Sequence, residues 1–195
     1  MKKLALLLAL TLTFALLLPS CIKDGVNVLD APPIKTGIID VKLSTSDDNV
    51  TFTETVKNAP TIGNNVFWEP GYIGYQFVKI ENAGTLNLKY KLEVVPQESN
   101  NLSEVIYLYA KVVDDSFRFN DPNDLEQLDR IGLLSEVNSA ANGTLMCGES
   151  TVICVALKMS ESAGIEYQNV TNGYTVTLYA SQLTAEDDSF DNNYN

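Results

Sequence analysis

Carboxylates are the side chains of this sequence most able to do chemistry, but the residue that usually assists them is missing. The chain has 25 acidic residues and no histidine. Without histidine, Ser-His-Asp and Cys-His catalysis, zinc hydrolysis through an HExxH motif and acid–base catalysis by imidazole are all excluded. The sequence also lacks glycine-rich phosphate-binding motifs. It therefore predicts a protein that is not an enzyme and that has no cofactor.

The carboxylates gather in short polar segments, namely Asp47-Asp48, Asp114-Asp115, Asp121 with Asp124, and Glu186-Asp187-Asp188 with Asp191. Loop carboxylates could bind Ca²⁺, but the residues after Asp121 do not follow the spacing of an EF-hand loop. A zinc site is disfavoured because the only soft ligands are cysteines. Solvated acidic loops are the simpler interpretation, and we predict no metal site.

The first cysteine, Cys21, ends a segment typical of export signals. Lys2 and Lys3 precede an uncharged apolar run at residues 4–18, which is short for a membrane-spanning helix. The sequence Leu18-Pro19-Ser20-Cys21 resembles the lipobox of bacterial lipoproteins, whose cysteine receives a diacylglyceryl group. Residues 1–21 are therefore predicted to be a lipoprotein signal peptide, with an ordinary secretory signal as the alternative. Lipidation of Cys21 would place the protein outside the cell, anchored at the membrane surface.

The other two cysteines, Cys147 and Cys154, are separated by six residues. In an exported protein this pair predicts a disulfide across the end of a hairpin. Two buried free thiols are the alternative.

Charge restricts the partners. Removal of the signal takes away two of the 13 basic residues and none of the 25 acidic residues, which leaves a formal net charge of −14. We expect no binding to nucleic acid, and a membrane link through the lipid alone. Residues 22–36 are predicted to be a tether or a donor strand, residues 37–184 one folded domain, and residues 185–195 an acidic tail.

The clearest elements lie at residues 72–81 and 86–95. Glu69-Pro70-Gly71 predicts a tight turn before the first of them, and the second alternates apolar and polar residues with period two. Between them, Asn82-Ala83-Gly84-Thr85 is typical of a reversal in which glycine supplies a positive φ. The sequence therefore predicts a β-hairpin.

Short β-rich runs recur along the rest of the chain, at residues 37–43, 49–56, 104–113, 143–147, 151–159 and 173–182. A helix is predicted after the N-cap Asp121, with Pro122 at its first position and with Leu125, Leu128 and Ile131 on one face. Together the elements predict an all-β protein, an antiparallel jelly-roll-like β-sandwich with one or two short helices.

The chain also resembles the TasA and camelysin family of exported bacterial surface and biofilm-matrix proteins, over most of residues 37–191. Each motif is weak alone, but their order is fairly specific. In chain order they are Gly37-Ile38-Ile39-Asp40-Val41, Trp68-Glu69-Pro70-Gly71, Ile80-Glu81-Asn82-Ala83-Gly84-Thr85-Leu86 with Lys89-Tyr90, Ala163-Gly164-Ile165-Glu166-Tyr167-Gln168, Thr177-Leu178-Tyr179-Ala180-Ser181-Gln182 and Glu186-Asp187-Asp188-Ser189-Phe190.

The resemblance implies a jelly roll and, as in fibre-forming members, assembly by donation of an N-terminal strand to the next subunit. An unpaired sheet edge can accept such a strand. The candidate donor residues are Val26, Val28 and Leu29, or Ile39, Val41 and Leu43. A lipid on Cys21 would suit an anchor better than a repeating subunit.

Two main functional hypotheses follow, and an enzyme that uses only carboxylate chemistry is the third. In the first, the protein is a non-enzymatic surface lipoprotein that acts as a filament or matrix subunit or anchor, with copies of itself or related surface subunits as partners. In the second, it is a monomeric module that binds a glycan, a peptide or calcium, for which its nine tyrosines could form a stacking platform. Tyrosines inside strand runs are more simply core residues.

Overall fold

The computed structural model describes residues 37–55, 61–63, 66–98, 100–167 and 170–183, which belong to one compact unit. The predicted signal peptide, tether and acidic tail lie outside these residues, as do Cys21, Val26, Val28 and Leu29. None of the helices in the described ranges is long and apolar enough to cross a membrane.

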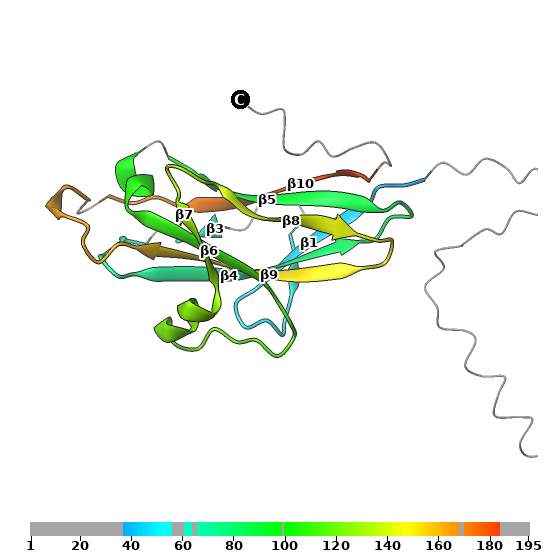
Figure 1. Cartoon of the computed structure of the whole chain (residues 1–195), viewed down its shortest axis with the longest axis horizontal. Helices are drawn as coiled ribbons and strands as arrows, with labels where there is room; N and C mark the ends of the chain where they lie inside the picture. Colours follow the sequence, from blue (N-terminus) through cyan, green and yellow to red (C-terminus); the bar gives the residue numbers. More distant parts are fainter. Residues whose placement is uncertain (1–36, 56–60, 64–65, 99, 168–169, 184–195) are drawn as a thin grey trace, which may run out of the picture. The chain divides into compact units, whose positions relative to one another are not determined.

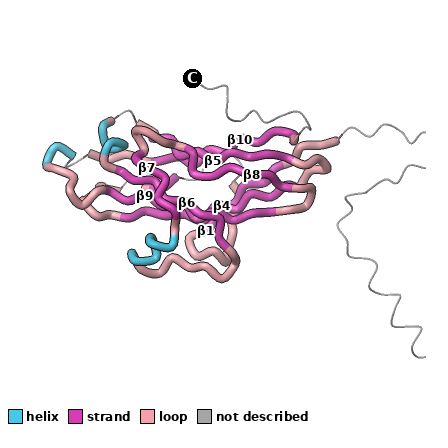
Figure 2. The backbone as a smooth tube through the Cα atoms, viewed as in Figure 1, coloured by secondary structure: helices cyan, strands magenta, loops and turns pink. Residues whose placement is uncertain are grey.

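Two antiparallel sheets pack face to face as a sandwich (Figures 1 and 2), so the predicted fold class is confirmed. In spatial order, the six-stranded sheet contains β2 (Thr53–Glu54), β1 (Val41–Ser46), β4 (Ile73–Asn82), β9 (Ser150–Met159), β6 (Ile106–Val113) and β7 (Asp129–Leu133). The four-stranded sheet contains β3 (Thr61–Ile62), β10 (Tyr174–Gln182), β5 (Leu88–Pro96) and β8 (Ser139–Leu145). The helical segments are the short 3₁₀ turns η1 (Asn101–Glu104), η2 (Pro122–Gln127) and η3 (Ile165–Tyr167).

The predicted hairpin of residues 72–81 and 86–95 is wrong, although both of its strands form. β4 lies in the six-stranded sheet between β1 and β9, and β5 lies in the four-stranded sheet between β10 and β8. Residues 83–87 therefore carry the chain from one sheet to the other. Alternation reports which face of a strand is buried, and it does not report which strand lies beside it.

The sandwich core lies between the two sheets. Alternate residues of the central strands fill it, among them Val78 and Ile80 of β4, Leu92 of β5, and Val155 and Leu157 of β9, each with no exposed surface. Because side chains alternate between the faces of a strand, Cys154 and Ala156 of β9 point away from this core. They are nevertheless buried, in a second apolar cluster on the outer face of the six-stranded sheet.

The segment that covers this outer face is the one predicted to be a helix, and the prediction is correct only at its start (Figure 1). Asp121 caps η2 and shares a capping box with Asp124, and Leu125 and Leu128 are buried in the second cluster. The helix ends at Gln127, and Ile131 lies in β7 with 40% of its surface exposed. The three-residue spacing of Leu125, Leu128 and Ile131 is compatible both with a helix and with a 3₁₀ turn followed by a strand, so it did not distinguish the two.

Candidate functional site

The most distinctive feature of the described structure is an incomplete sheet edge. One side of β10 pairs with β5 along its whole length, from Tyr174 opposite Pro96 to Gln182 opposite Leu88. The other side pairs with β3 only at Tyr174 and Thr175. Within the described ranges no strand pairs with this side at residues 176–182, which we call the open edge. An edge that lacks a strand partner among the described residues can pair with an added strand through its backbone N–H and C=O groups.

The side chains along β10 show that the core is uncovered at the open edge. Tyr174 and Val176 are buried and Leu178 is partly buried against the core. Ala180 continues this alternation and points the same way, but it is exposed, although its partner Tyr90 on β5 is buried. Exposure of the inward-facing side chains of β10 thus increases from Tyr174 to Ala180, toward the end of the strand.

The facing sheet is also incomplete on this side of the sandwich. Contacts of β3 with β4, and of β8 with β6, show that the β3–β10 side of the four-stranded sheet faces the side of the six-stranded sheet that holds β1 and β4. β2 pairs with β1 only at Ser44 and Thr45. Val41 of β1 is only partly buried, although it packs against the sandwich core. An apolar side chain from an added strand could therefore be covered by both sheets here.

The structure places the candidate donor residues in two groups. Val41 and Leu43 lie in β1, opposite Asn82 and Ile80 of β4, so in this chain they complete its own sheet. Ile39 precedes β1 and is 48% exposed. Ile39 is therefore described but lies in no strand, and the remaining candidates Val26, Val28 and Leu29 lie outside the described residues.

The described chain enters the sandwich beside the 83–87 connection. The Ala83 N–H donates to the Asp40 carbonyl and the Thr85 N–H to the Ile38 carbonyl, each at 2.9 Å. Gly84 lies between these bonds, where a Cβ would stand 2.3 Å from the Ile38 carbonyl oxygen. Gly84 does not have a positive φ, so the predicted reason for this glycine is wrong. The glycine is needed because two backbone segments approach closely.

Asn82 fastens the same end of the sandwich. Its side chain is fully buried; its amide donates to the carbonyls of Leu86 and Leu145, and its Oδ1 accepts from the Gly84 N–H. Asn82 therefore joins the two connections that pass between the sheets here. From the sequence, Asn82 is predicted only to be a turn residue. Residue type alone does not distinguish an asparagine in an exposed turn from one whose amide is buried.

The opposite end is fastened by Trp68 and Asn172. The Trp68 indole N–H donates to the Asn172 carbonyl at 2.9 Å, and the Asn172 amide donates to the Glu98 carbonyl at 3.0 Å. Gly71 has φ +86°, and the Tyr72 N–H donates to the Glu69 carbonyl, which confirms the predicted turn. The Trp-Glu-Pro-Gly motif is thus accounted for by packing.

The predicted Cys147–Cys154 disulfide is wrong, because Cys154 is a free thiol buried in the second cluster. β8 and β9 lie in different sheets, so the residues between them do not form the end of a hairpin. Burial raises the pKa of the Cys154 thiol to about 12. This thiol is therefore protonated and unreactive at neutral pH.

Besides the capping pair Asp121 and Asp124, two more acidic segments have structural roles. Asp48 accepts hydrogen bonds from the Thr51 N–H, the Ser46 hydroxyl and the Val50 N–H, and these bonds lower its pKa to about 2. Asp114 accepts from the hydroxyl and N–H of Ser116, which also lowers its pKa. No group of three or more Cys, Asp or Glu in the described part of the chain is arranged to hold a metal ion.

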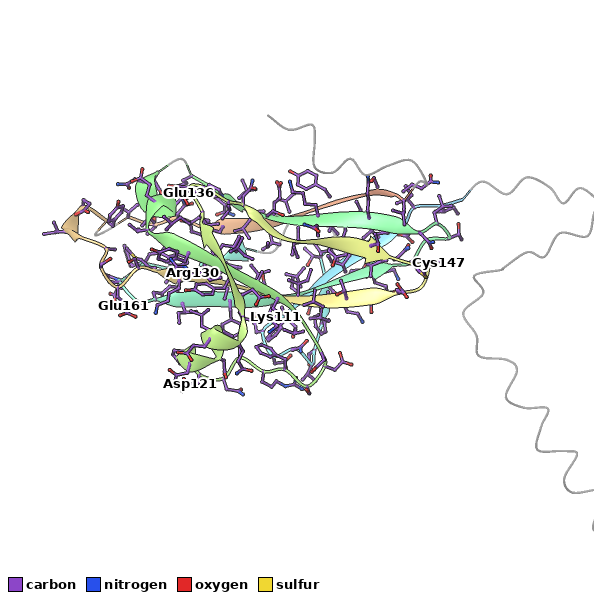
Figure 3. The ribbon with its side chains drawn as sticks, in the orientation of Figure 1. Lys111, Asp121, Arg130, Glu136, Cys147 and Glu161 are labelled. Atoms are coloured by element: carbon purple, nitrogen blue, oxygen red, sulfur yellow. The ribbon has the colours of Figure 1, made fainter. Side chains whose placement is uncertain are left out.

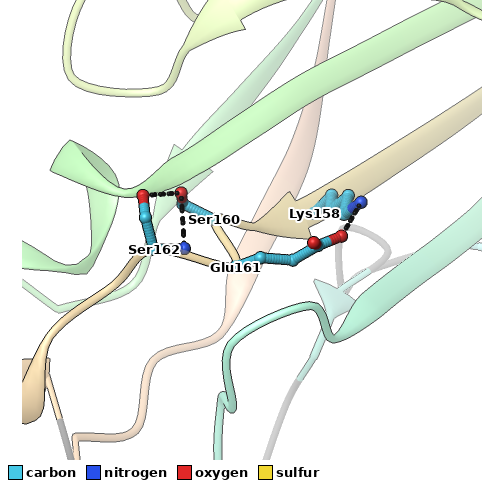
Figure 4. Close-up of polar contacts among 4 residues, drawn as sticks. All are labelled: Lys158, Ser160, Glu161 and Ser162. Carbon is cyan, nitrogen blue, oxygen red and sulfur yellow. Dashed lines mark hydrogen bonds and ion pairs between the residues drawn. The ribbon is translucent and has the colours of Figure 1, made fainter.

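The outer face of the six-stranded sheet carries a cleft of about 500 Å³, lined among others by Tyr109, Glu126, Lys158 and Glu161. The Lys158 ammonium lies 2.8 Å from a Glu161 carboxylate oxygen, and this contact lowers the pKa of Glu161 (Figure 4). Tyr109 is half-buried in the second cluster, whereas Tyr90 belongs to the sandwich core. Tyr90 and Tyr109 therefore lie in different layers, whereas Tyr75 and Tyr109 both pack against the second cluster.

Comparison with known proteins gives no further assignment. No protein-family model matches this chain, and no curated protein is significantly similar to it.

Proposed function

We propose that this chain is a non-enzymatic cell-surface lipoprotein that acts as a filament or biofilm-matrix subunit or anchor and assembles by strand donation. The open edge of β10 is the observation that carries the proposal. The resemblance to the TasA and camelysin family and the lipobox-like sequence at Cys21 support it.

The donor in this proposal is residues 22–36 of another copy or of a related subunit. Fifteen extended residues span up to ~50 Å. The open edge has seven residues and needs a partner of about 23 Å. The segment is therefore long enough to pair along the edge and still connect to its own domain at residue 37. Val26 and Val28, two residues apart, could point together toward the exposed Ala180 side.

Substitution at the acceptor tests this assignment. Ala180→Lys places a charge on the inward side of the open edge, where an exposed site tolerates it but an added strand would bury it. Thr177→Lys is the matched control, because residue 177 points to the outer face of the same strand. We expect purified chain from residue 22 onward to form filaments visible by electron microscopy, the Ala180→Lys variant to remain monomeric, and the control to assemble.

The donor is tested by deletion of residues 22–36. The shortened chain should fold, because the described residues form a compact unit without this segment. It should no longer assemble alone. Assembly that survives both the deletion and Ala180→Lys would refute strand donation at this edge.

A monomeric binding module is the second candidate, and the cleft beside Tyr109 favours it. A tyrosine flanked by the charged pair Lys158 and Glu161 offers an apolar ring surface together with a hydrogen-bond donor and acceptor. Calorimetric titration of monomer with glycans, peptides and Ca²⁺ tests this function. Binding that is lost in Tyr109→Ala, in a chain that never assembles, would support it over the first proposal.

A further inference from the structure

The two ends of the sandwich carry apolar side chains that nothing in the described chain covers. The first end, where the described chain begins, has exposed Ile38, Ile39, Met146 and Leu183. We call these four residues the N-terminal end face. Figure 3 shows Cys147, next to Met146, at this end of the sandwich and Glu161 at the other.

Hydrogen bonds hold the members of the N-terminal end face around one connection, residues 83–87. The Thr85 N–H donates to the Ile38 carbonyl, and the Leu183 N–H donates to the Asn87 carbonyl, each at 2.9 Å. The Cys147 N–H donates to the Asn87 side chain at 3.1 Å. Ile38, Met146 and Leu183 therefore lie on one surface, although they are far apart in the sequence.

The opposite end carries a second pair of exposed apolar side chains, Phe67 and Ile165, which we call the distal tip. Phe67 is 64% exposed and Ile165 is 79% exposed. Phe67 forms a β-bridge with Thr171, just before β10 begins, and Ile165 opens η3. These residues leave large side chains in water, without a contact among the described residues that would explain them.

The direction of β10 relates these two ends to the proposed strand donation. β10 runs from the distal end, where Tyr174 is opposite Pro96, to the N-terminal end, where Gln182 is opposite Leu88. Residues 22–36 join the fold at the N-terminal end. If they folded back on their own β10 they would run parallel to it, whereas every pairing in both sheets is antiparallel.

A donor from another copy meets the antiparallel requirement only in one arrangement. Its residues 22–36 must run from the N-terminal end of the acceptor toward the acceptor's distal end. The donor's own domain, which begins at residue 37, then lies beyond that distal end. The N-terminal end face of the donor is the surface from which this segment leaves, so it is brought against the acceptor's distal tip.

We propose that the N-terminal end face packs on the distal tip of a second copy of this chain, in a head-to-tail contact. The inference rests on the proposed function, because strand donation sets the relative direction of the two copies. It adds a second, apolar interface between them. Burial of six large side chains removes apolar surface from water. The contact joins two different surfaces and leaves one of each free, so it repeats without closing and builds a filament.

Charge also favours an end-to-end arrangement. The formal net charge of −14 that remains without the signal repels copies that approach side by side, where whole sheet faces would be apposed. End contacts bring the smallest area of each molecule together. A membrane surface is the competing occupant of the N-terminal end face, because the proposed lipid anchor leaves from the same end.

Two double variants separate these occupants. The face variant carries Ile38→Glu and Met146→Glu, and the tip variant carries Phe67→Glu and Ile165→Glu. All four positions are more than half exposed, so both variants should fold as the wild type does. Each is measured from residue 22 onward by sedimentation velocity and electron microscopy, alone and as an equimolar mixture, and by flotation with phosphatidylcholine vesicles.

We expect each variant alone to need about tenfold or more higher concentration than the wild type to form filaments. The mixture should stop at a 1:1 dimer, because only one intact end face and one intact tip remain. The Ala180→Lys variant tests strand donation separately. Filaments that form normally in both double variants but not in Ala180→Lys would overturn the end contact and leave strand donation intact.

Other results would also overturn the inference. A tip variant that still dimerises while the face variant does not would show a symmetric contact between two end faces. Flotation of the wild type with vesicles that is lost in the face variant, without any 1:1 dimer in the mixture, would assign the end face to a membrane. A mixture that remains monomeric at concentrations where the wild type assembles would exclude complementary ends.

Discussion

Single polar and small residues hold the two ends of this sandwich. Asn82 and Asn172 are buried amides that hydrogen-bond to connections between the sheets, and Gly84 allows the entering chain to lie against one of those connections. Their types could be read from the sequence as turn residues. Their partners could not, because Asn82 bonds to Leu145 and Asn172 to Glu98, which are 63 and 74 residues away.

Gly84→Val should destabilise the domain by about 1–3 kcal/mol, because the added side chain would collide with backbone atoms of residues 38 and 40. Chemical denaturation measures the change in the free energy of unfolding. Ala83→Val is the matched control, since the Ala83 side chain is exposed. Equal stabilities of the two variants would mean that the entering segment does not lie against Gly84.

Asp48 should make stability depend on pH in the acid range. Its pKa is about 2 in the folded protein, below the ordinary value of 3.8, because hydrogen bonds from Thr51, Ser46 and Val50 favour the carboxylate. Its stabilising effect is therefore complete above pH 4 and is lost as the pH falls through 2. Between these values the Tm of the wild type should fall more steeply than that of Asp48→Ala.

The neighbouring substitution Asp47→Ala provides the control for this pH measurement. It removes one carboxylate from the same loop without removing the acceptor of these three bonds. We expect the Tm of Asp47→Ala to fall with decreasing pH as steeply as that of the wild type. A fall as shallow as that of Asp48→Ala would mean that the overall charge of the loop, and not the hydrogen bonds of Asp48, causes the pH dependence.

At the scale of elements, local pattern predicted the strands but not their neighbours. Residues 72–81 and 86–95 were correctly expected to be strands, because period-two alternation is a property of consecutive residues. Their placement in different sheets depends on contacts with β1, β9, β10 and β8, which local pattern does not encode. The open edge of β10 was beyond prediction for the same reason, since it depends on how short β3 is.

The outer-face cover gives a prediction at this scale. Leu125→Ala should destabilise the protein by about 2–4 kcal/mol, because Leu125 is buried in the second cluster beside Phe77 and Cys154. Ile131→Ala should cost much less, because Ile131 is exposed in β7. Denaturant unfolding of both variants measures the difference. Similar losses of unfolding free energy in the two variants would instead support the predicted helix, in which Leu125 and Ile131 share one buried face.

The same pair of variants can be followed at Cys154. Loss of the Leu125 side chain should speed the reaction of this thiol with a disulfide reagent, whereas Ile131→Ala should leave it slow. A thiol that reacts rapidly in the wild type would contradict its burial.

At the scale of the whole molecule, the proposed lipid on Cys21 and the proposed assembly act at one end. The described chain begins at the N-terminal end face, so an anchor on Cys21 and the donor residues 22–36 would leave from the same surface. When the donor segment of one copy pairs with another subunit, that subunit lies between the first copy's domain and its lipid anchor. The length of that subunit then sets the distance of the domain from the membrane. This geometry suits an anchor that begins a filament.

Cys21→Ser should release the protein from cells into the medium, because it removes the proposed acyl chains. Fractionation followed by intact-mass measurement distinguishes the two signal types. A membrane-bound wild type with a mass increase on Cys21 supports lipidation. A soluble wild type cleaved near Ser20 would favour an ordinary secretory signal.

The order in which the strands meet has a consequence for the time the chain takes to fold. Ile73 lies opposite Lys158, and Leu88 lies opposite Gln182, so both sheets are closed by residues 85 or more positions apart. Such distant pairing makes folding slow, on the order of milliseconds to seconds. β10 is the last strand of the described chain, and its open edge exists only after it has joined β5. A copy can therefore accept a donor strand at this edge only after its own β10 has paired with β5, so its folding must precede its assembly.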